Sequence, residues 1–148
     1  MRPDVTQREE HPRILVIEAT VGRTPLGEEI SSPLSEAGFS TVRIPGYPGA
    51  LLELEVFKPD MVILDEAVSG SLELCYQYAT ASIPVILVGA DTSQEIWNKA
   101  LIEAGAEFYL RRPICHKVLV ARIKAILRRY EHRGNRRWTP GGDSNRQA

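Results

Sequence analysis

The stretch Pro59-Asp60-Met61-Val62-Ile63-Leu64-Asp65 decides the fold. A turn signal opens it, four apolar residues follow, and a carboxylate closes it. Because the apolar residues occupy every position and not alternate ones, the run predicts a strand that is buried on both faces, as in a parallel sheet. Open α/β sheets place their ligands and chemistry at the carboxyl ends of such strands. Asp65 is therefore the first candidate functional residue.

Further short apolar runs lie along the chain, and segments of helical length separate them. This alternation predicts an α/β domain in which helices cover a parallel sheet. Five helices are expected, at about 24–37, 50–57 and 72–78 and then in segments that begin at Thr92 and near Lys117. The four other strands are expected at residues 14–17, 41–44, 85–88 and 108–110.

Three local signals define helix ends. Thr24 is expected as the N-cap of the first helix, and Pro33 inside this helix is expected to kink it or delay its start. Thr92 opens a capping-box sequence, and Gly105 supplies a C-terminal stop. These signals bound the first and fourth helices.

The composition indicates one domain with two polar ends. The chain has 148 residues, of which 25% are charged and 43% hydrophobic, as in an ordinary globular domain. We expect a polar extension at 1–11, a folded domain at 12–130 and a basic, disordered tail at 131–148. From residue 128 onward, six arginines and two acids give +4, so the first 127 residues carry −5 of the net −1. An acidic core argues against direct nucleic-acid binding by the core.

No feature of the sequence predicts export or membrane insertion. No apolar run approaches the roughly 18–20 residues that span a bilayer, and the polar N-terminus lacks the apolar core of a signal peptide. Cys75 and Cys115 form no disulfide-dense or metal-binding pattern, which suits a reducing compartment. We expect a cytoplasmic protein with no membrane partner.

In their order and spacing, four stretches resemble the response-regulator receiver domain of two-component signalling. The resemblance covers residues 13–129. It implies a flavodoxin-like, doubly wound sheet of five parallel strands in the order 2-1-3-4-5, with five helices. The four stretches are Arg13-Ile14-Leu15-Val16-Ile17-Glu18, Pro59 to Asp65, Ile83-Pro84-Val85-Ile86-Leu87-Val88-Gly89-Ala90 and Gly105-Ala106-Glu107-Phe108-Tyr109-Leu110-Arg111-Arg112-Pro113.

The resemblance also implies a chemistry. In the family a histidine kinase donates a phosphoryl group to an aspartate, which Asp65 matches, and a divalent cation and a lysine neutralise the charge of the transferring group. The family has a second acid after the position of Glu18, and this chain has Ala19 there. The resemblance therefore implies a weak Mg²⁺ site at most, formed by Glu18, Asp65 and the Ala67 carbonyl.

Two further departures from the family concern the conformational change that phosphorylation causes. Gly89 stands where the family has a Ser or Thr, and Arg112 stands for the lysine, with a planar fork in place of a compact ammonium group. In the family this hydroxyl binds the phosphoryl group, and an aromatic residue of the fifth strand then swings inward behind it. Tyr109 matches that aromatic residue, and Pro113 matches a proline that follows a cis peptide bond. A charge-assisted hydrogen bond contributes about 1.5–3 kcal/mol, whereas a full two-state switch needs about 5.5 kcal/mol. We therefore hypothesise that the domain is fixed in one state. Arg112 either faces Asp65 as a permanent internal cation or points to solvent.

The family's dimerisation face corresponds here to the segments at 92–104, 108–110 and 117–130. Trp97 lies off the apolar face of its helix, where a large aromatic either anchors an interface or is partly buried. The other interface candidates are charged: Lys99, Glu103, Glu107, Arg122 and Arg129.

We interpret the chain as a signalling module of a phosphorelay that acts by protein contact and not as a turnover enzyme, with weak or no phosphorylation of Asp65. Its expected partners are a histidine kinase or another signalling protein, and a second copy of the chain. One alternative is a working Mg²⁺-dependent phosphoacceptor at Asp65 that regulates transcription or a partner. Another is a phosphate-ligand binder through the Gly22 loop, residues 20–25, which opens a helix.

Overall fold

The sheet has five parallel strands in the order β2-β1-β3-β4-β5, as the resemblance implies. The computed structural model describes residues 11–19, 24–46, 56–90 and 94–132. Every strand begins and ends within one residue of its apolar run. The strands are β1 (Arg13–Ile17), β2 (Ser40–Ile44), β3 (Met61–Asp65), β4 (Val85–Gly89) and β5 (Phe108–Arg111).

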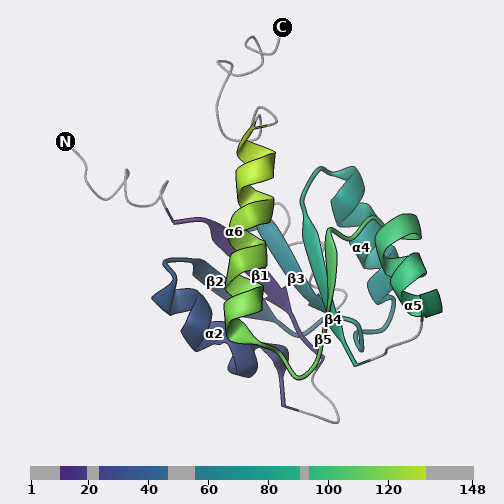
Figure 1. Cartoon of the computed structure of the whole chain (residues 1–148), viewed down its shortest axis with the longest axis horizontal. Helices are drawn as coiled ribbons and strands as arrows, with labels where there is room; N and C mark the ends of the chain where they lie inside the picture. The colour runs from purple at the N-terminus through teal and green to yellow at the C-terminus, as the bar shows by residue number, and fades with distance from the viewer. Residues whose placement is uncertain (1–10, 20–23, 47–55, 91–93, 133–148) are drawn as a thin grey trace, which may run out of the picture.

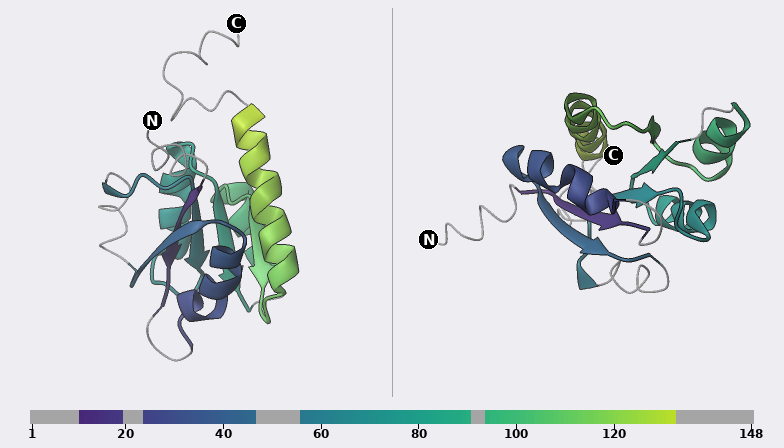
Figure 2. Two further views of the ribbon diagram at one scale, coloured as in Figure 1. Left: turned by 90° about the vertical axis from the view of Figure 1, so that its left-hand side faces the viewer. Right: turned by 90° about the horizontal axis from the view of Figure 1, so that it is seen from below.

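Helices cover both faces of this sheet. Helices α2 (Leu26–Glu36) and α6 (His116–His132) lie on one face, and α4 (Ser71–Thr80) and α5 (Gln94–Asn98) lie on the other (Figures 1 and 2). Four α-helices are present in the described residues, where five were expected. The expected helix at 50–57 falls mostly outside them, so that part of the prediction stays open.

The two-sided cover explains why the first four residues of β3, Met61 to Leu64, are all apolar. Val62 and Leu64 pack into the core on the α4 side, together with Leu15 and Tyr78. Met61 and Ile63 pack into the core on the α2 and α6 side, together with the inward face of α6. Since all five residues of β3 are buried, Asp65 at its end is buried with them.

Helix α2 begins one residue later than the sequence predicts. Pro25, in an extended conformation, takes the N-cap position that was expected for Thr24, and no side chain caps the helix from that position. The Glu18 carboxylate instead accepts a hydrogen bond of 2.7 Å from the Gly27 amide, so a strand end supplies the anion that a helix N-terminus favours. Pro33 does not delay the start of the helix, because α2 begins at Leu26 and continues through Pro33.

The segment expected as the fourth helix changes its winding. After α5 the chain continues as the π-helical turn η1 (Lys99–Glu103), and the Ala104 amide donates to the Lys99 carbonyl five residues earlier. Gly105 then ends the segment with a φ of +79°, as predicted. The capping residues Thr92 and Ser93 lie outside the described residues.

The expected domain boundaries are only partly covered by the structure. Helix α6 extends to His132, two residues past the expected end of the folded domain. The polar extension and the basic tail fall almost wholly outside the described residues, and so does most of the Gly22 loop. No helix in the described part of the chain has the length and apolar character of a membrane span.

The two cysteines should differ sharply in reactivity. Burial raises the pKa of the Cys75 thiol to about 12, whereas Cys115 is exposed. At pH 8 roughly one Cys75 thiol in 10,000 is then the reactive thiolate. We predict that iodoacetamide labels the native chain once, at Cys115, and that a Cys115→Ser variant stays unlabelled until it is unfolded in urea. Fast labelling of Cys75 in the native Cys115→Ser chain would contradict this packing, and intact mass measures both.

Candidate functional site

Asp65 lies at the carboxyl end of the central strand with both carboxylate oxygens engaged. Its side chain is 1% exposed. Oδ1 accepts a hydrogen bond of 2.9 Å from the Ala67 amide, and Oδ2 accepts one of 3.1 Å from Arg112 Nη2. The tight turn after β3, in which the Val68 amide donates to the Asp65 carbonyl, brings the Ala67 amide back to the carboxylate. Ala67, expected to offer its carbonyl to a metal, here donates its amide to Asp65.

Arg112 connects three elements of the fold. Its amide donates to the Gly89 carbonyl at 2.7 Å, which fixes the loop after β5 against β4. The guanidinium reaches both Asp65 on β3 and Glu29 on α2, with Nη2 at 3.1 Å from an oxygen of each. The bond from Arg112 to Pro113 is cis, as the resemblance implies. Arg112 therefore faces Asp65 as an internal cation.

The electrostatic balance at Arg112 favours its charged form. Burial by itself would lower the pKa of Arg112, but the hydrogen bonds and charges of Asp65 and Glu29 outweigh it, so the pKa is raised. A buried carboxylate without a partner is costly. The pairing with Arg112 therefore compensates the cost of burying the Asp65 carboxylate.

Glu18 is engaged by a second arginine. Arg43 Nη2 lies 3.1 Å from Glu18 Oε2, and Arg43 Nε also donates to this carboxylate. Gly27 supplies the room, because a Cβ at this position would overlap both the Arg43 guanidinium and Glu18 Oε1. Glu18 thus joins β1, β2 and the start of α2.

This arrangement does not fit the Mg²⁺ site that the resemblance implies. Arginines and amides occupy the oxygens of both Glu18 and Asp65, and Ala19 contributes no ligand. Among the described residues, no group of three or more His, Cys, Asp or Glu side chains could hold a metal. The carboxylates of Glu18 and Asp65 are thus engaged in protein contacts, and the assignment of a metal ion to Glu18, Asp65 and the Ala67 carbonyl stays a prediction.

A second cluster surrounds Gly89 at the end of β4. Tyr109, 2% exposed, points inward, and its hydroxyl donates a hydrogen bond of 2.8 Å to Glu66 Oε1. The Trp97 ring contacts the Tyr109 ring at a centroid distance of 5.7 Å. No separate role was predicted for Glu66. Its role could have been suspected from two features of the sequence: Glu66 is an acid directly after Asp65, and position 89 lacks the hydroxyl that the family has there.

The candidate interface residues divide into two groups. Glu107 binds Arg129 at 2.6 Å, and Arg122 lies over the Phe108 ring at 4.2 Å. These three charged residues thus have partners within the chain, whereas Lys99 and Glu103 are exposed. Trp97 is partly buried against the core on the α4 side, so it is not a freely exposed anchor.

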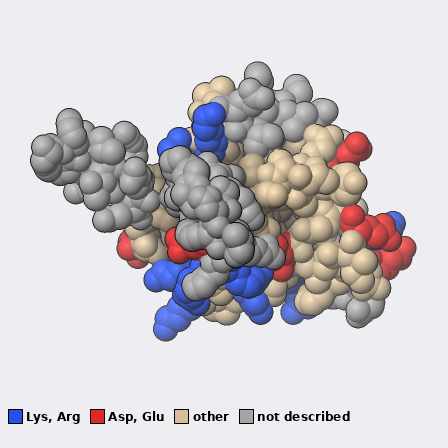
Figure 3. Space-filling view, turned by 90° about the horizontal axis from the view of Figure 1, so that it is seen from above, with Lys and Arg blue, Asp and Glu red and all other residues tan. Residues whose placement is uncertain are grey.

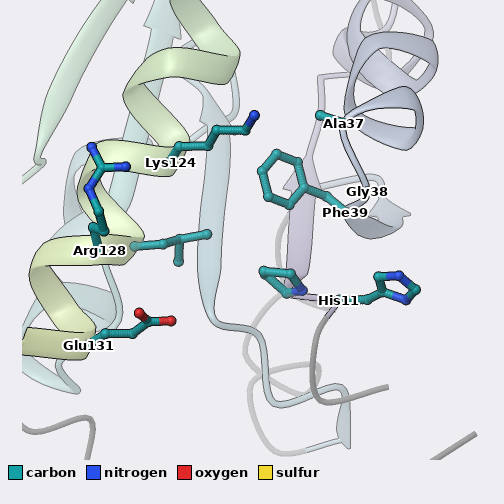
Figure 4. A pocket seen from close by; sticks show the side chains of 9 residues that line it. His11, Ala37, Gly38, Phe39, Lys124, Arg128 and Glu131 are labelled. Atoms are coloured by element: carbon teal, nitrogen blue, oxygen red, sulfur yellow. The ribbon is translucent and has the colours of Figure 1, made fainter. Parts of the chain in front are cut away.

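The solvent face of α6 is basic and borders a pocket of about 460 Å³ at the opposite edge of the sheet from Asp65. Lys and Arg side chains gather along one side of the molecule in Figure 3. Figure 4 shows Lys124, Arg128 and Glu131 of α6 on one wall of the pocket and His11 and Phe39 on the other. None of the candidate site residues lines it.

The order of the strands and the contacts of Asp65 define a class of protein. A carboxylate ends the middle strand of a 2-1-3-4-5 sheet and faces a basic residue in the loop after the last strand. This combination is that of a flavodoxin-like receiver domain.

Comparisons with known proteins give the family. The chain is 34% identical over 123 residues to the phosphate regulon transcriptional regulatory protein PhoB of Klebsiella pneumoniae. The match covers 79% of this chain and 52% of PhoB. It is also 36% identical over 107 residues to the sensory transduction protein RegX3 of Mycolicibacterium smegmatis. That match covers 70% of this chain and 46% of RegX3. No protein-family model matches the chain.

Solved structures agree with these relatives. HP1043, an orphan response regulator of H. pylori, aligns with a TM-score of 0.66 at 27% identity, over 78% of this chain and 96% of that one. A two-component response regulator from Clostridium difficile aligns with a TM-score of 0.71 at 24% identity, over 80% of this chain and 98% of that one. The chain belongs to the response-regulator receiver domains, and it spans about half the length of the curated relatives it matches.

We predict that Arg112→Met destabilises the domain by about 3–5 kcal/mol, because it leaves a buried carboxylate without its cation. Urea unfolding measures the loss. Adding Asp65→Asn should recover much of it, since the double variant buries no unpaired charge at this position.

The matched control is Arg129→Met, which breaks the more exposed pair with Glu107 and should cost at most about 1 kcal/mol. Equal losses in Arg112→Met and Arg129→Met, with no recovery in the double variant, would contradict the account of the buried pair.

Proposed function

We propose that the chain is a receiver module of two-component signalling that acts by protein contact, with weak or no phosphorylation of Asp65. The observation that carries this proposal is the engagement of Asp65 by Arg112 and the Ala67 amide. An attacking carboxylate oxygen must be accessible, and a cation must neutralise the incoming phosphoryl group. Here the carboxylate is buried, and its cation is already paired with two acids.

Mg²⁺ supplies the charge neutralisation in receiver domains that bind it at the phosphorylation site. In this chain Arg43 and Arg112 hold the two carboxylates. Each arginine contributes a fixed positive charge that does not depend on a dissolved ion. This supports a domain whose charge balance is complete without phosphorylation.

The proposed partners follow from the family. Response regulators interact with histidine kinases, so a kinase or another cytoplasmic signalling protein is the first candidate. A second copy of the chain is another, through the face made by α5, η1, β5 and α6, where Lys99, Glu103 and Ile102 are exposed. Such a role needs no turnover by this domain and no nucleic-acid contact by its core.

One observation favours the alternative of a working phosphoacceptor. Arg112 Nη1 is buried and has no hydrogen-bond partner in the described part of the structure. A phosphoryl oxygen on Asp65 would be an acceptor for it, and a charge-assisted hydrogen bond of that kind is strong. A buried unsatisfied donor of this type calls for such an explanation.

Phosphoryl transfer to the full chain distinguishes the two readings. We predict that Mg²⁺ and acetyl phosphate leave the intact mass of the wild-type chain unchanged, because Asp65 is buried and paired. The Asp65→Asn variant is the control for transfer elsewhere. A stoichiometric phosphoryl adduct on the wild type that is absent from Asp65→Asn would favour the working phosphoacceptor.

A further inference from the structure

We infer that Glu66 is a built-in latch: its carboxylate holds Tyr109 inward at Gly89, so the conformation of this part of the domain does not depend on the state of Asp65. This inference deepens the proposed function and rests on it for its signalling role. The latch is made of Glu66, Gly89 and Tyr109, and Trp97 reports on it.

The main chain holds Glu66 in place on both sides. Its amide donates to the Val88 carbonyl at 2.8 Å, and its carbonyl accepts a hydrogen bond of 2.9 Å from Ser71 Oγ at the start of α4. The side chain therefore leaves from a fixed point next to β4. It reaches the Tyr109 hydroxyl on β5, which donates to Oε1 at 2.8 Å.

Gly89 is required by space and not by backbone conformation. It lies within β4, and it is not among the described glycines with positive φ. A Cβ at position 89 would overlap both Glu66 Oε1 and the Tyr109 hydroxyl oxygen. The volume that any side chain at 89 would occupy is thus filled by the hydrogen bond between Glu66 and Tyr109.

The inward Tyr109 also fixes its surroundings. Trp97 of α5 packs on the Tyr109 ring. It also packs against the core that contains Tyr109, Ala100 of η1 and Ala104 at the end of η1. If Tyr109 turned outward, it would leave a space beneath Trp97, and the hydrogen bond between the Tyr109 hydroxyl and Glu66 would break. The position of α5 and η1 on β5 therefore depends on the latch.

None of these contacts involves the Asp65 carboxylate. Its oxygens bind Arg112 and Ala67, while the latch uses a separate carboxylate one residue later. A ligand or modification shifts a conformational equilibrium only as far as it interacts differently with the two states. An internal carboxylate that is always present holds the inward state permanently.

Trp97 provides the measurement. The chain has two tryptophans, so the experiment uses the full chain with Trp138→Phe, and it records Trp97 emission, its quenching by acrylamide and its indole amide resonance. Glu66→Ala should lower the ratio of inward to outward Tyr109 by roughly 10- to 150-fold, the effect of one lost charge-assisted hydrogen bond. Quenching of Trp97 should then rise.

Further variants separate the latch from general damage. Tyr109→Phe removes only the hydroxyl and should move the Trp97 signals in the same direction as Glu66→Ala, while the control Glu73→Ala, at an exposed position of α4, should leave them unchanged. Gly89→Ser should displace Tyr109. Urea midpoints establish that each variant is folded, and if Gly89→Ser is not, Glu66→Ala and Tyr109→Phe decide.

The outcome for Asp65 is distinct from the outcome for the latch. Asp65→Asn, or a phosphorylated Asp65 if one forms, should leave the Trp97 signals of the wild type unchanged. Phosphorylation with unchanged Trp97 signals would overturn the proposed function and keep the latch. Trp97 signals that are unaltered in Glu66→Ala and Tyr109→Phe, or that respond to Asp65→Asn as strongly as to Glu66→Ala, would overturn the latch.

Discussion

The buried ion pair between Arg112 and Asp65 is the constraint on which the rest of the site depends. A strand covered on both faces places its terminal carboxylate out of water, where an isolated charge is very costly. The Arg112 guanidinium offsets that cost, because its Nη2 lies 3.1 Å from Asp65 Oδ2. The same nitrogen lies 3.1 Å from Glu29 Oε1 on α2. The pair therefore couples the central strand, the first described helix and the loop after β5. Any ligand of Asp65 has to compete with it.

Two small clusters repeat one arrangement around this pair. In each, an acid next to a strand end is held by a partner from elsewhere in the fold, and a glycine provides the room. Glu18 pairs with Arg43 over Gly27, and Glu66 pairs with Tyr109 over Gly89. In both cases an internal contact takes the place that a dissolved ligand or a hydroxyl side chain would otherwise have. This arrangement supports the proposal that the domain presents one conformation to its partners.

The sequence predicted the sheet well, because strands buried on both faces leave continuous apolar runs that differ from the amphipathic pattern of α6. Of the two orientations that the sequence left open for Arg112, the structure shows the inward one, in which it faces Asp65. The roles of Arg43 and Glu66 were not predicted, since their partners lie 25 and 43 residues away in the chain and no local pattern pairs them. The N-cap of α2 was wrong by one residue because Glu18 caps the helix from β1. The π-helical turn at η1 was not predicted, because a capping box indicates where a helix begins and not how it winds further along.

The central claim is that internal arginines, and not a dissolved cation, neutralise the carboxylates at the end of the sheet. A titration of the ¹⁵N-labelled chain with Mg²⁺, followed at the amides of Ala67 and Gly27 that donate to Asp65 and Glu18, tests it most directly. The account predicts no saturable shift of either amide in the physiological range of Mg²⁺. Saturable shifts of both amides, lost in Asp65→Asn, would contradict it.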